Sequence, residues 1–383
     1  MNRSLKVYDL SLKVQGPVFV GSGYEIQKKE YLFLNRNKVG IVDAEKLYLL
    51  AKRRHLEADL EQFMVKNTSE DLLHWIQQNR IPTREIESCM KYVLNAGDIQ
   101  TEQEKKQMEQ GKKQMERGKM QIMACMADPY GNPYIPGSSI KGMLRTILLC
   151  ADIIQYPEKY RTERINIKED ISTRCNRKCD RKSVLSKNIE AIENKAFHTL
   201  RKGEKVNDAV NDIMAGVIIG DSDVLERKDI ILCQKWEHHI DGKEKTINLL
   251  RECIIPGTVI HAKMTIDQSI CHLTPEEILK AVEIFYNRYY DVFQSKFSGI
   301  DRASDRTVFL GGGCGFVSKT MIYAMFEGRE GVSIVKDIFE KTGVPRNHKH
   351  GEDVKKGVSP HVLKCTRYEG KEYMMGQCEL SIS

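Results

Sequence analysis

Segments with the two-residue period of a β-strand alternate with helical segments at irregular intervals along this chain. Apolar and polar residues alternate over residues 10–14, and the apolar runs 230–234 and 258–266 predict strands far downstream. Residues 274–277 read Thr-Pro-Glu-Glu, which combines a capping box with proline at the first helical position and predicts a helix to about residue 297. A doubly wound fold would repeat its strand and helix about every 30 residues. The irregular spacing therefore predicts an α+β fold, with two small open sheets and helices on one face.

Weaker local signals place the remaining elements. Turn-forming residues between two short apolar runs predict a hairpin, and an aspartate before an apolar helical face predicts an N-cap. The expected elements are a hairpin over 31–42, a helix after Asp43, helical sequence over 69–82, a strand, turn and helix over 121–150, a strand over 217–220, a strand into Gly311, a helix from Ser318 and a final hairpin turning at 369–370. Residues 105–118 repeat a heptad without an apolar face, which predicts an exposed insertion rather than a coiled coil.

Positive charge is concentrated in two parts of the chain. The 383 residues carry a formal charge of +7, and residues 161–205 contain 13 basic and seven acidic side chains. A second basic zone, 341–364, holds six basic and two acidic residues together with three histidines. Phosphate contacts supply most of the non-specific affinity of proteins for nucleic acids, so these zones favour a polyanionic partner. A solvated, flexible insertion explains the first zone equally well.

Length and composition argue against several other classes of protein. A chain of 383 residues exceeds the usual single core, and 41% hydrophobic with 30% charged residues is typical of a globular protein of two domains. No apolar stretch is long enough to span a bilayer, and the amino terminus lacks the features of a signal peptide. Eleven scattered cysteines do not form a disulfide framework. We therefore expect a cytoplasmic protein with reduced thiols and no membrane partner.

The first candidate site is the predicted helix start at 136–145, which reads Pro-Gly-Ser-Ser-Ile-Lys-Gly-Met-Leu-Arg. Backbone amides at a helix N-terminus, the hydroxyls of Ser138 and Ser139, and the cations Lys141 and Arg145 converge there in a way that suits a phosphate. Like charges four residues apart destabilise a helix unless an anion lies between them. The alternative is that one of the two serines caps the helix and both cations point into solvent, and the residues alone leave both interpretations open.

The second candidate site is a glycine-rich loop that joins a predicted strand to a predicted helix. Its candidate residues are Gly311, Gly312, Gly313, Gly315 and Lys319. Backbone amides in such a loop can wrap around phosphates. The sequence departs from a P-loop, because the glycine that should precede the lysine is Ser318, and it also departs from the dinucleotide-binding fingerprint at Phe316. A nucleotide-hydrolysing enzyme is therefore disfavoured.

Two patterns resemble parts of a zinc site. Cys175, Cys179 and His198 form a sparse set of ligands, and His348-Lys-His350 forms a fragment of another set. A structural zinc site needs four ligands at recognisable spacing, which neither pattern supplies. Isolated thiols in a basic loop are the commoner explanation, so we expect no metal.

Other polar pairs give equally weak signals for catalysis. His238 and His239 would point to opposite sides of a strand, so their adjacency does not make an acid–base couple. Asp221 and Asp223 could share a divalent ion, although aspartates that cap a turn are more common. We therefore expect no cofactor and no catalytic residues.

The stretch 128–145 resembles the signature of the RAMP proteins of CRISPR effector complexes, in which a turn leads into a Pro-Gly-Ser-Ser-x-Lys-Gly-x-x-Arg helix start. The loop 311–319 resembles the glycine-rich loop of the same superfamily. The chain length, the form of this loop, the His/Lys tract after it and the ending Met-Gly-Gln-Cys-Glu-Leu at 375–380 are most similar to the subunit that caps the type III-A (Csm) complex at the 3′ end of its guide RNA.

This resemblance implies two ferredoxin-like (RRM-like) domains, in agreement with the α+β interpretation. An N-terminal domain would cover 1–160 with a helical insertion at about 43–120, a basic insertion would cover 161–210, and a C-terminal domain with the glycine-rich loop would cover 211–383. The implied role is non-catalytic binding of the CRISPR RNA (crRNA) at its 3′ end and support of crRNA maturation in antiviral defence. The implied partners are the crRNA, the backbone RAMP subunits and small helical subunit of the Csm complex, host 3′ exonucleases and, indirectly, target RNA.

Three functions compete on these grounds. The leading one is RNA binding by Ser138, Ser139, Lys141, Arg145, Gly311, Gly312, Gly313, Gly315 and Lys319, through contacts to the RNA backbone, because the aromatic RNP1 pattern of base-stacking RRM domains is absent. The alternative is a metal-independent RAMP endoribonuclease that processes crRNA, with His198, His348, His350 and His361 as candidates in basic surroundings. A scaffold that binds only proteins would assemble independently of salt and would not bind RNA.

Overall fold

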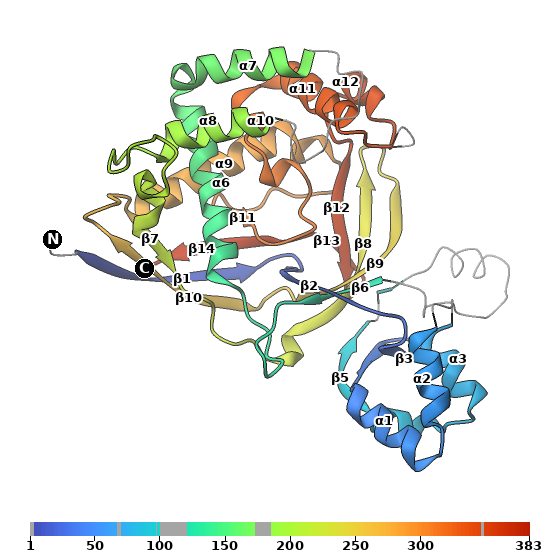
Figure 1. The fold of residues 1–383 in the computed structure, drawn as a ribbon. Helices are drawn as coiled ribbons and strands as arrows, with labels where there is room; N and C mark the ends of the chain where they lie inside the picture. The colour runs from blue at the N-terminus through green and yellow to red at the C-terminus, as the bar shows by residue number, and fades with distance from the viewer. Residues whose placement is uncertain (1–3, 67–69, 97, 100–120, 173–184, 346–347) are drawn as a thin grey trace.

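The computed structural model describes residues 4–66, 70–96, 98–99, 121–172, 185–345 and 348–383 (Figure 1). These residues form two β-sheets, a layer of helices that covers them, and a small helical lobe that projects from one end of the second sheet. The arrangement confirms the predicted α+β class with two sheets. The repeated heptad at 105–118 lies outside the described residues. Within the described ranges, no helix is both long enough and apolar enough to cross a membrane.

The first sheet is antiparallel and has five strands in the order β11-β14-β1-β10-β7. Its strands are β1 (Leu5–Val14), β7 (Val217–Ile219), β10 (Val259–Asp267), β11 (Thr307–Phe309) and β14 (Gln377–Ile382). Strand β1 lies between β10 and β14, so segments from both ends of the chain meet in one sheet. Leu10, Leu12 and Val14 of β1 are buried, as their two-residue period predicted.

The second sheet has nine strands among the described residues, in the order β2-β6-β9-β8-β5-β4-β3, with β12 on β8 and β13 on β12. Its strands are β2 (Gly21–Ile26), β3 (Tyr31–Asn35), β4 (Lys38–Val42), β5 (Met90–Asn95), β6 (Gln121–Cys125), β8 (Ile230–His239), β9 (Glu244–Ile254), β12 (Val362–Tyr368) and β13 (Lys371–Met374). The two predicted hairpins are confirmed as β3–β4 and β12–β13. Both sheets combine strands from 1–160 and 211–383, and the domain boundaries themselves stay a prediction.

This sheet is larger than the small open sheet that we expected, and one reason is β9, which the sequence analysis did not predict. The inward side chains of β9 include Thr246 and Glu252, so no alternation of apolar and polar residues marks the strand. The Glu252 carboxylate accepts hydrogen bonds from the Tyr92 hydroxyl (2.7 Å) and the Cys125 amide (3.0 Å). A buried carboxylate is therefore held between β5, β6 and β9 by groups that are distant in sequence.

The main core lies between the sheets and the long helices α6 (Gly137–Gln155) and α9 (Pro275–Val292), which pack against each other. The predicted capping box is confirmed: the Thr274 hydroxyl accepts from the Glu277 amide, and the Glu277 carboxylate accepts from the Thr274 amide. Helix α9 ends at Val292, earlier than the expected residue 297. Phe293 leaves the helical conformation (φ −135°, ψ −69°), and its ring is buried in the core.

The helix predicted from Ser318 is wrong in its extent. A single 3₁₀ turn covers Val317–Lys319, and two separate helices follow, α10 (Ile322–Met325) and α11 (Gly328–Lys341). Phe326 and Glu327 between these two helices adopt extended backbone angles (φ −122° and −100°), so α10 ends before α11 begins. In the described part of the basic zone after α11, a 3₁₀ turn (His350–Glu352) leads into the short helix α12 (Asp353–Lys356).

The basic insertion forms two helices, α7 (Arg161–Ser172) and α8 (Ser186–Phe197), with 173–184 outside the described residues. Ile167 and Ile192 are buried, so these helices pack on the protein. Arg164 and Lys168 both form ion pairs with Glu330 of α11. The flexible-insertion interpretation is therefore wrong for α7 and α8, and part of their positive charge is used within the fold.

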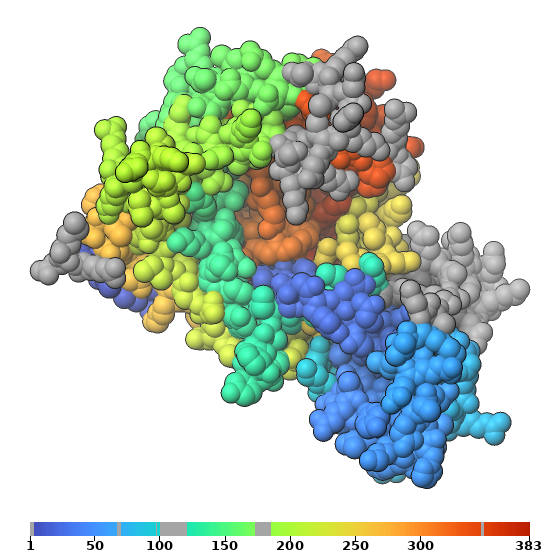
Figure 2. Space-filling view, viewed as in Figure 1, coloured from blue at the N-terminus to red at the C-terminus, as the bar shows by residue number. Residues whose placement is uncertain are grey.

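The helical lobe stands apart from the main body in Figures 1 and 2 and has a core of its own. Its helices are α1 (Ala44–Arg53), α2 (Glu57–Val65), α3 (Leu72–Gln78) and α4 (Thr83–Glu87). Asp43 caps α1 as predicted, because its carboxylate accepts from the amides of Glu45 and Lys46. The rings of Phe63 and Trp75 stack 5.8 Å apart at the centre of this core.

Candidate nucleic-acid interface

The start of α6 lies against protein carboxylates. The N-cap residue is Pro136, and no side chain caps the helix in the usual way, so the predicted cap by Ser138 or Ser139 is wrong. Instead, Asp221 from the segment after β7 accepts a hydrogen bond from the Gly137 amide (2.8 Å). A Cβ atom on Gly137 would overlap the carbonyl oxygen of Ile219, which explains why glycine is needed where α6 meets β7.

Arg145, one of the two predicted cations of α6, is engaged inside the protein. Its guanidinium donates to Asp212 (2.7 Å) and to Glu193 of α8 (2.9 Å), and it lies 4.3 Å from the centre of the Phe197 ring. This arrangement fastens α8 to α6. The two carboxylates also neutralise Arg145. The side chain therefore does not point into solvent, as it would if the helix start had only a structural role.

Lys141, one turn before Arg145, is half-buried and has no hydrogen bond or ion pair within the described part of the chain. Burial lowers the pKa of its ammonium group, and the nearby Asp212 carboxylate opposes that effect. Of the two serines, Ser138 is exposed and Ser139 is half-buried. This end of α6 therefore combines two cations with three carboxylates, those of Asp212, Asp221 and Glu193.

The glycine-rich loop has the backbone geometry of an anion-binding nest. Gly311, Gly313 and Gly315 have positive φ angles of 79°, 88° and 89°, and they alternate with residues of negative φ. A Cβ atom on Gly311 would overlap the Phe19 carbonyl oxygen, to which the Gly312 amide donates (2.6 Å). The loop is therefore fixed to the segment between β1 and β2, and glycine is required at Gly311 for both conformation and space.

Several backbone amides of this loop are available to a ligand. Within the residues that the structure describes, the amides of Gly313, Cys314 and Gly315 donate to no acceptor. Ser318, the residue that broke the P-loop pattern, is buried, and its hydroxyl contacts the carbonyl oxygens of Cys314 and Gly315 at 3.2 Å each. The loop thus turns its carbonyl groups inward and leaves amides for an anion.

Four cations surround the loop, and we call them the basic cluster. They are Lys235 of β8, Arg251 of β9, Lys364 of β12 and Lys319 at the end of the loop. A Cβ atom on Gly313 would lie 3.0 Å from the Arg251 guanidinium, and one on Gly315 would lie 3.4 Å from the Lys364 side chain. Glu237 is the one carboxylate in ion-pair contact with these cations in the described structure, and it binds Lys364 and, at 3.9 Å, Lys235.

The cations of the cluster repel one another. Burial, together with the charges of Lys364 and Arg251, lowers the pKa of Lys235 to about 8. Arg251 stacks 5.4 Å from the Phe19 ring, and no carboxylate among the described residues pairs with it. An anion bound at the loop would relieve this repulsion.

Sequence reasoning found Lys319 and the glycines but missed the other three cations. Residues 233, 235 and 237 of β8 share one face because side chains alternate along a strand, and the register places Cys233 opposite Arg251 and Glu237 opposite Lys364. No spacing along the chain signals this grouping, because the cations come from three strands and a loop.

Among the described residues, the remaining candidates His198 and Asp221 contact protein groups outside the loop. Cys175 and Cys179 lie outside the described residues, and His198 Nδ1 contacts the Val206 carbonyl oxygen (2.9 Å). Asp221 caps α6, and the structure gives no contact between it and Asp223.

The histidines of β8 and of the second basic zone lie on the second sheet and on the segments beside it, and His348 is close to Glu237, Lys235 and Lys364. His238 and His239 point to opposite faces of β8, as predicted: His238 contacts Glu372, and His239 faces His361. The candidates His348, His350 and His361 lie together in one cluster.

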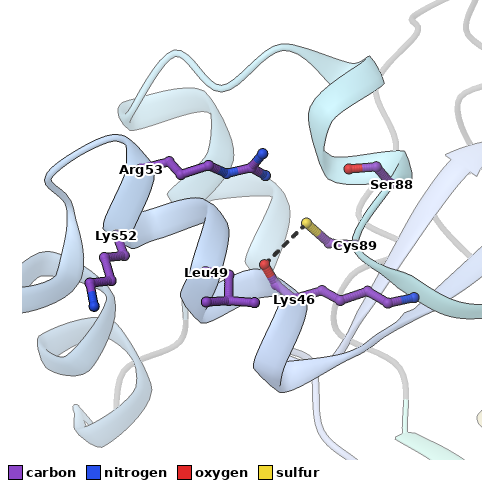
Figure 3. A pocket seen from close by; sticks show the side chains of 6 residues that line it. All are labelled: Lys46, Leu49, Lys52, Arg53, Ser88 and Cys89. Atoms are coloured by element: carbon purple, nitrogen blue, oxygen red, sulfur yellow. Dashed lines mark hydrogen bonds between the residues drawn. The ribbon is translucent and has the colours of Figure 1, made fainter.

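A further basic hollow lies on the helical lobe (Figure 3). Its volume is about 510 Å³, and it is lined by Lys46, Leu49, Lys52, Arg53, Ser88 and Cys89. Arg53 and Lys46 flank Ser88 and Cys89 in Figure 3, whereas Lys52 points away. The Cys89 thiol contacts the Lys46 carbonyl oxygen (3.5 Å), and burial raises its pKa. No pattern in the sequence predicted this surface.

Comparisons with known proteins agree with the fold. The sequence profile of the RAMP superfamily matches residues 11–318. The chain is 30% identical over 401 residues to the CRISPR-system protein Csm5 of Mycobacterium tuberculosis strain H37Rv, covering 100% of this chain and 99% of that protein. It is 25% identical over 328 residues to Csm5 of Streptococcus thermophilus, covering 84% and 82%.

Two solved structures have the same fold. One is a chain of a Csm–crRNA–target RNA ternary complex of a type III-A CRISPR-Cas system, with a TM-score of 0.64, 17% identity and coverage of 98% of this chain and 100% of that chain. The other is the crystal structure of T. onnurineus Csm5, with a TM-score of 0.56, 17% identity and coverage of 96% and 99%. The two-sheet α+β architecture is thus the two-domain, ferredoxin-like arrangement that the sequence predicted.

Proposed function

Since the chain belongs to the RAMP superfamily and, within it, to the Csm5 family, we propose that it is a crRNA-binding structural subunit of a type III-A CRISPR effector complex. In this role it caps the 3′ end of the crRNA and supports crRNA maturation. Its partners are the crRNA, the backbone RAMP subunits and the small helical subunit, with target RNA contacted indirectly and host 3′ exonucleases recruited for trimming. A structural neighbour from a Csm–crRNA–target RNA complex supports this assignment.

The glycine-rich loop and the basic cluster carry the proposal. Three free backbone amides lie beside four cations that have one carboxylate partner in the described structure. Such a surface attracts phosphates of any RNA sequence, which suits a subunit that must accept every spacer. The start of α6, with Ser138, Ser139, Lys141 and Arg145, shapes the RNA channel and positions α8, because its charges are matched by protein carboxylates.

The histidine geometry supports binding over RNA cleavage. General acid–base cleavage needs two groups that reach the RNA. His198 lies against a backbone carbonyl, and the side chains of His350 and His361 are 11% and 8% exposed with their Nδ1 atoms bonded to Asp353. His348 is the one exposed residue among the four candidates.

A salt series with end-labelled repeat-spacer RNA in chelator tests the RNA-binding surface. The double variant Arg251→Ala/Lys364→Ala should weaken binding uniformly across RNA sequences and lower the slope of log affinity against log salt by about two. The matched control Lys243→Ala/Lys280→Ala removes two exposed cations elsewhere and should leave the slope unchanged. Equal slopes for wild type and the Arg251→Ala/Lys364→Ala variant would refute the assignment. Shortened RNA in chelator would favour the ribonuclease.

The capping role needs the assembled complex. Co-expression with the other Csm subunits and a repeat-spacer array should yield crRNA of mature length with the wild-type chain. The Arg251→Ala/Lys364→Ala variant should yield complexes whose crRNA 3′ ends are heterogeneous. Sequencing of the bound RNA measures this. Unchanged 3′ ends in complexes that contain the Arg251→Ala/Lys364→Ala variant would assign 3′-end capping to another surface.

A further inference from the structure

The basic hollow on the helical lobe, which we call the lobe hollow, is lined by α1 and by the two residues that join α4 to β5, Ser88 and Cys89 (Figure 3). On α1, its lining residues Lys46, Leu49 and Arg53 are three and four positions apart, so they lie on the same face of the helix. At 1.5 Å per residue, about 10 Å of helix separates Lys46 from Arg53. Two cations thus lie on either side of a leucine.

The protein does not neutralise the charge of the lobe hollow. None of its six described lining residues is acidic, and Lys52 adds a third cation. Two nearby carboxylates are engaged elsewhere, because Glu85 binds the Arg54 guanidinium at 2.6 and 2.9 Å and Asp43 caps α1. Lys52 and Arg53 form no ion pair within the described residues. The lobe hollow therefore keeps an excess of positive charge.

The uncharged part of the lining is apolar. Leu49 is 49% exposed. The Ser88 hydroxyl donates to the Glu85 carbonyl oxygen (2.6 Å), and the Cys89 thiol contacts the carbonyl oxygens of Lys46 and Glu85 (3.5 Å each). A ligand therefore meets cationic groups and aliphatic carbon, and the described lining has no aromatic ring on which an RNA base could stack. Acidic and apolar side chains of a protein match both parts of this lining, whereas an RNA strand matches only the charge.

We propose that the lobe hollow binds an acidic segment of a partner protein. The segment presents two carboxylates about 10 Å apart, on either side of one apolar side chain. Its carboxylates pair with Lys46 and Arg53, its apolar side chain packs on Leu49, and Lys52 adds to the field that attracts it. A helix with acidic residues seven positions apart and a leucine between them has this spacing. The lobe projects from the main body in Figures 1 and 2, which leaves room for a partner beside it.

The probe that tests the proposal is a fluorescein-labelled, alanine-based helical peptide with glutamate, leucine and glutamate at positions i, i+4 and i+7. In this order the peptide matches Arg53, Leu49 and Lys46 when it lies antiparallel to α1. Fluorescence anisotropy with the full-length protein at low salt should show saturable binding that weakens as salt is added. The same peptide with glutamine in place of both glutamates should bind about fivefold more weakly, because it keeps the leucine but neither charge.

Variants of the lobe hollow separate the charge from the apolar contact. Lys46→Ala/Arg53→Ala should weaken binding of the acidic peptide about fivefold, as expected for the loss of two exposed ion pairs. Leu49→Ser should weaken it about threefold, because a partly exposed leucine becomes buried on binding.

Two matched controls change exposed residues near the lobe hollow that do not line it. Arg84→Ala/Lys91→Ala removes two exposed cations of α4 and β5, and Leu73→Ser removes an exposed leucine of α3. Both should bind the acidic peptide as wild type does. Unfolding followed by tryptophan fluorescence, to which Trp75 in the core of the lobe contributes, checks that every variant is folded.

The proposal fails if wild type does not bind the acidic peptide, if the glutamine peptide binds equally well, or if the variants of the lobe hollow bind as their controls do. RNA is the other class of ligand that cations attract. With end-labelled repeat-spacer RNA, Lys46→Ala/Arg53→Ala should leave the salt slope unchanged, and a slope lowered by about two would assign the lobe hollow to RNA and overturn the proposal. The peptide assays contain no RNA, so their failure leaves the proposed crRNA-binding role unaffected.

Discussion

The start of α6 and the glycine-rich loop are two segments whose local sequence suits a phosphate, and the fold places them in opposite electrostatic surroundings. At the start of α6, Asp212 and Glu193 bind Arg145, Asp212 lies near Lys141, and Asp221 accepts from the Gly137 amide. At the loop, Glu237 binds Lys364 and Lys235, whereas Arg251 and Lys319 have no carboxylate partner among the described residues. The first segment is already neutralised by the protein, and the second is left with an excess of positive charge in the described structure.

This difference shows that a backbone able to bind phosphate is not by itself a phosphate-binding site. A helix N-terminus or a glycine nest supplies aligned amides, which attract any anion. A protein carboxylate such as Asp221 competes with a phosphate because it is covalently attached and always present. The identity of the neighbouring charges, rather than the motif, decides which segment remains available to an anion.

Glycine substitutions should give the largest effects and separate backbone conformation from close contact. Gly311→Ala should lower the free energy of unfolding by about 3 kcal/mol, because it combines a left-handed φ with overlap on the Phe19 carbonyl. Gly137→Ala should cost about 2 kcal/mol, since it meets the Ile219 carbonyl but has no positive φ. Urea denaturation followed by circular dichroism measures both.

The control for these variants is Gly142→Ala in the second turn of α6, where a Cβ atom would meet nothing within 4 Å. This change should stabilise the protein by roughly 0.5–1 kcal/mol, because alanine favours a helix. If Gly311→Ala unfolds at the same urea concentration as Gly142→Ala, the loop is not held as described.

Arg145→Met tests whether the α6 cation is structural. The methionine keeps the apolar stem but leaves Asp212 and Glu193 without their partner, so stability should fall by about 1–2 kcal/mol, between the values for exposed and buried ion pairs. The salt slope of RNA binding should stay unchanged, measured by filter binding. A slope lowered by about one would show that Arg145 binds a phosphate after all.

Variants that each remove a single cation compare the two segments directly. Arg251→Ala should weaken RNA binding several-fold and lower the salt slope by about one, because this guanidinium has no carboxylate partner in the described structure. Lys141→Ala should change the slope by less than half as much, since Asp212 lies beside it. Equal changes for the two variants would remove the distinction between the segments.

The smallest expected effect is a pH dependence that arises from Lys235. Burial and like charges lower its pKa to about 8, so the side chain loses its proton as the pH rises from 7 to 9. RNA affinity should therefore fall over that range, while fold stability rises, because the unfolded chain binds the proton more tightly than the folded one. Lys235→Met should remove this pH step, and a step that persists in the variant would assign it to another group.

Local signals predicted most of the elements, and their failures have physical causes. The capping box at Thr274 and the N-cap at Asp43 form as expected, because both depend on residues within one helical turn. Strand β9 escaped prediction since its inward Glu252 is satisfied by groups of β5 and β6 that no local pattern reveals. The helix expected from Ser318 is divided at Phe326 and Glu327, whose extended backbone separates α10 from α11.

The candidate site likewise has one property that the sequence determined and one that only the tertiary structure decided. The sequence alone determined the backbone of the site, because Gly311, Gly313 and Gly315 adopt positive φ angles that other residues avoid. Tertiary structure alone decided its charge: Arg145 meets Glu193 and Asp212 from 48 and 67 positions away, and three strands bring Lys235, Arg251 and Lys364 to one loop. Dihedral preferences act within a residue and its neighbours, whereas Coulomb interactions depend on distance in space and are indifferent to separation along the chain.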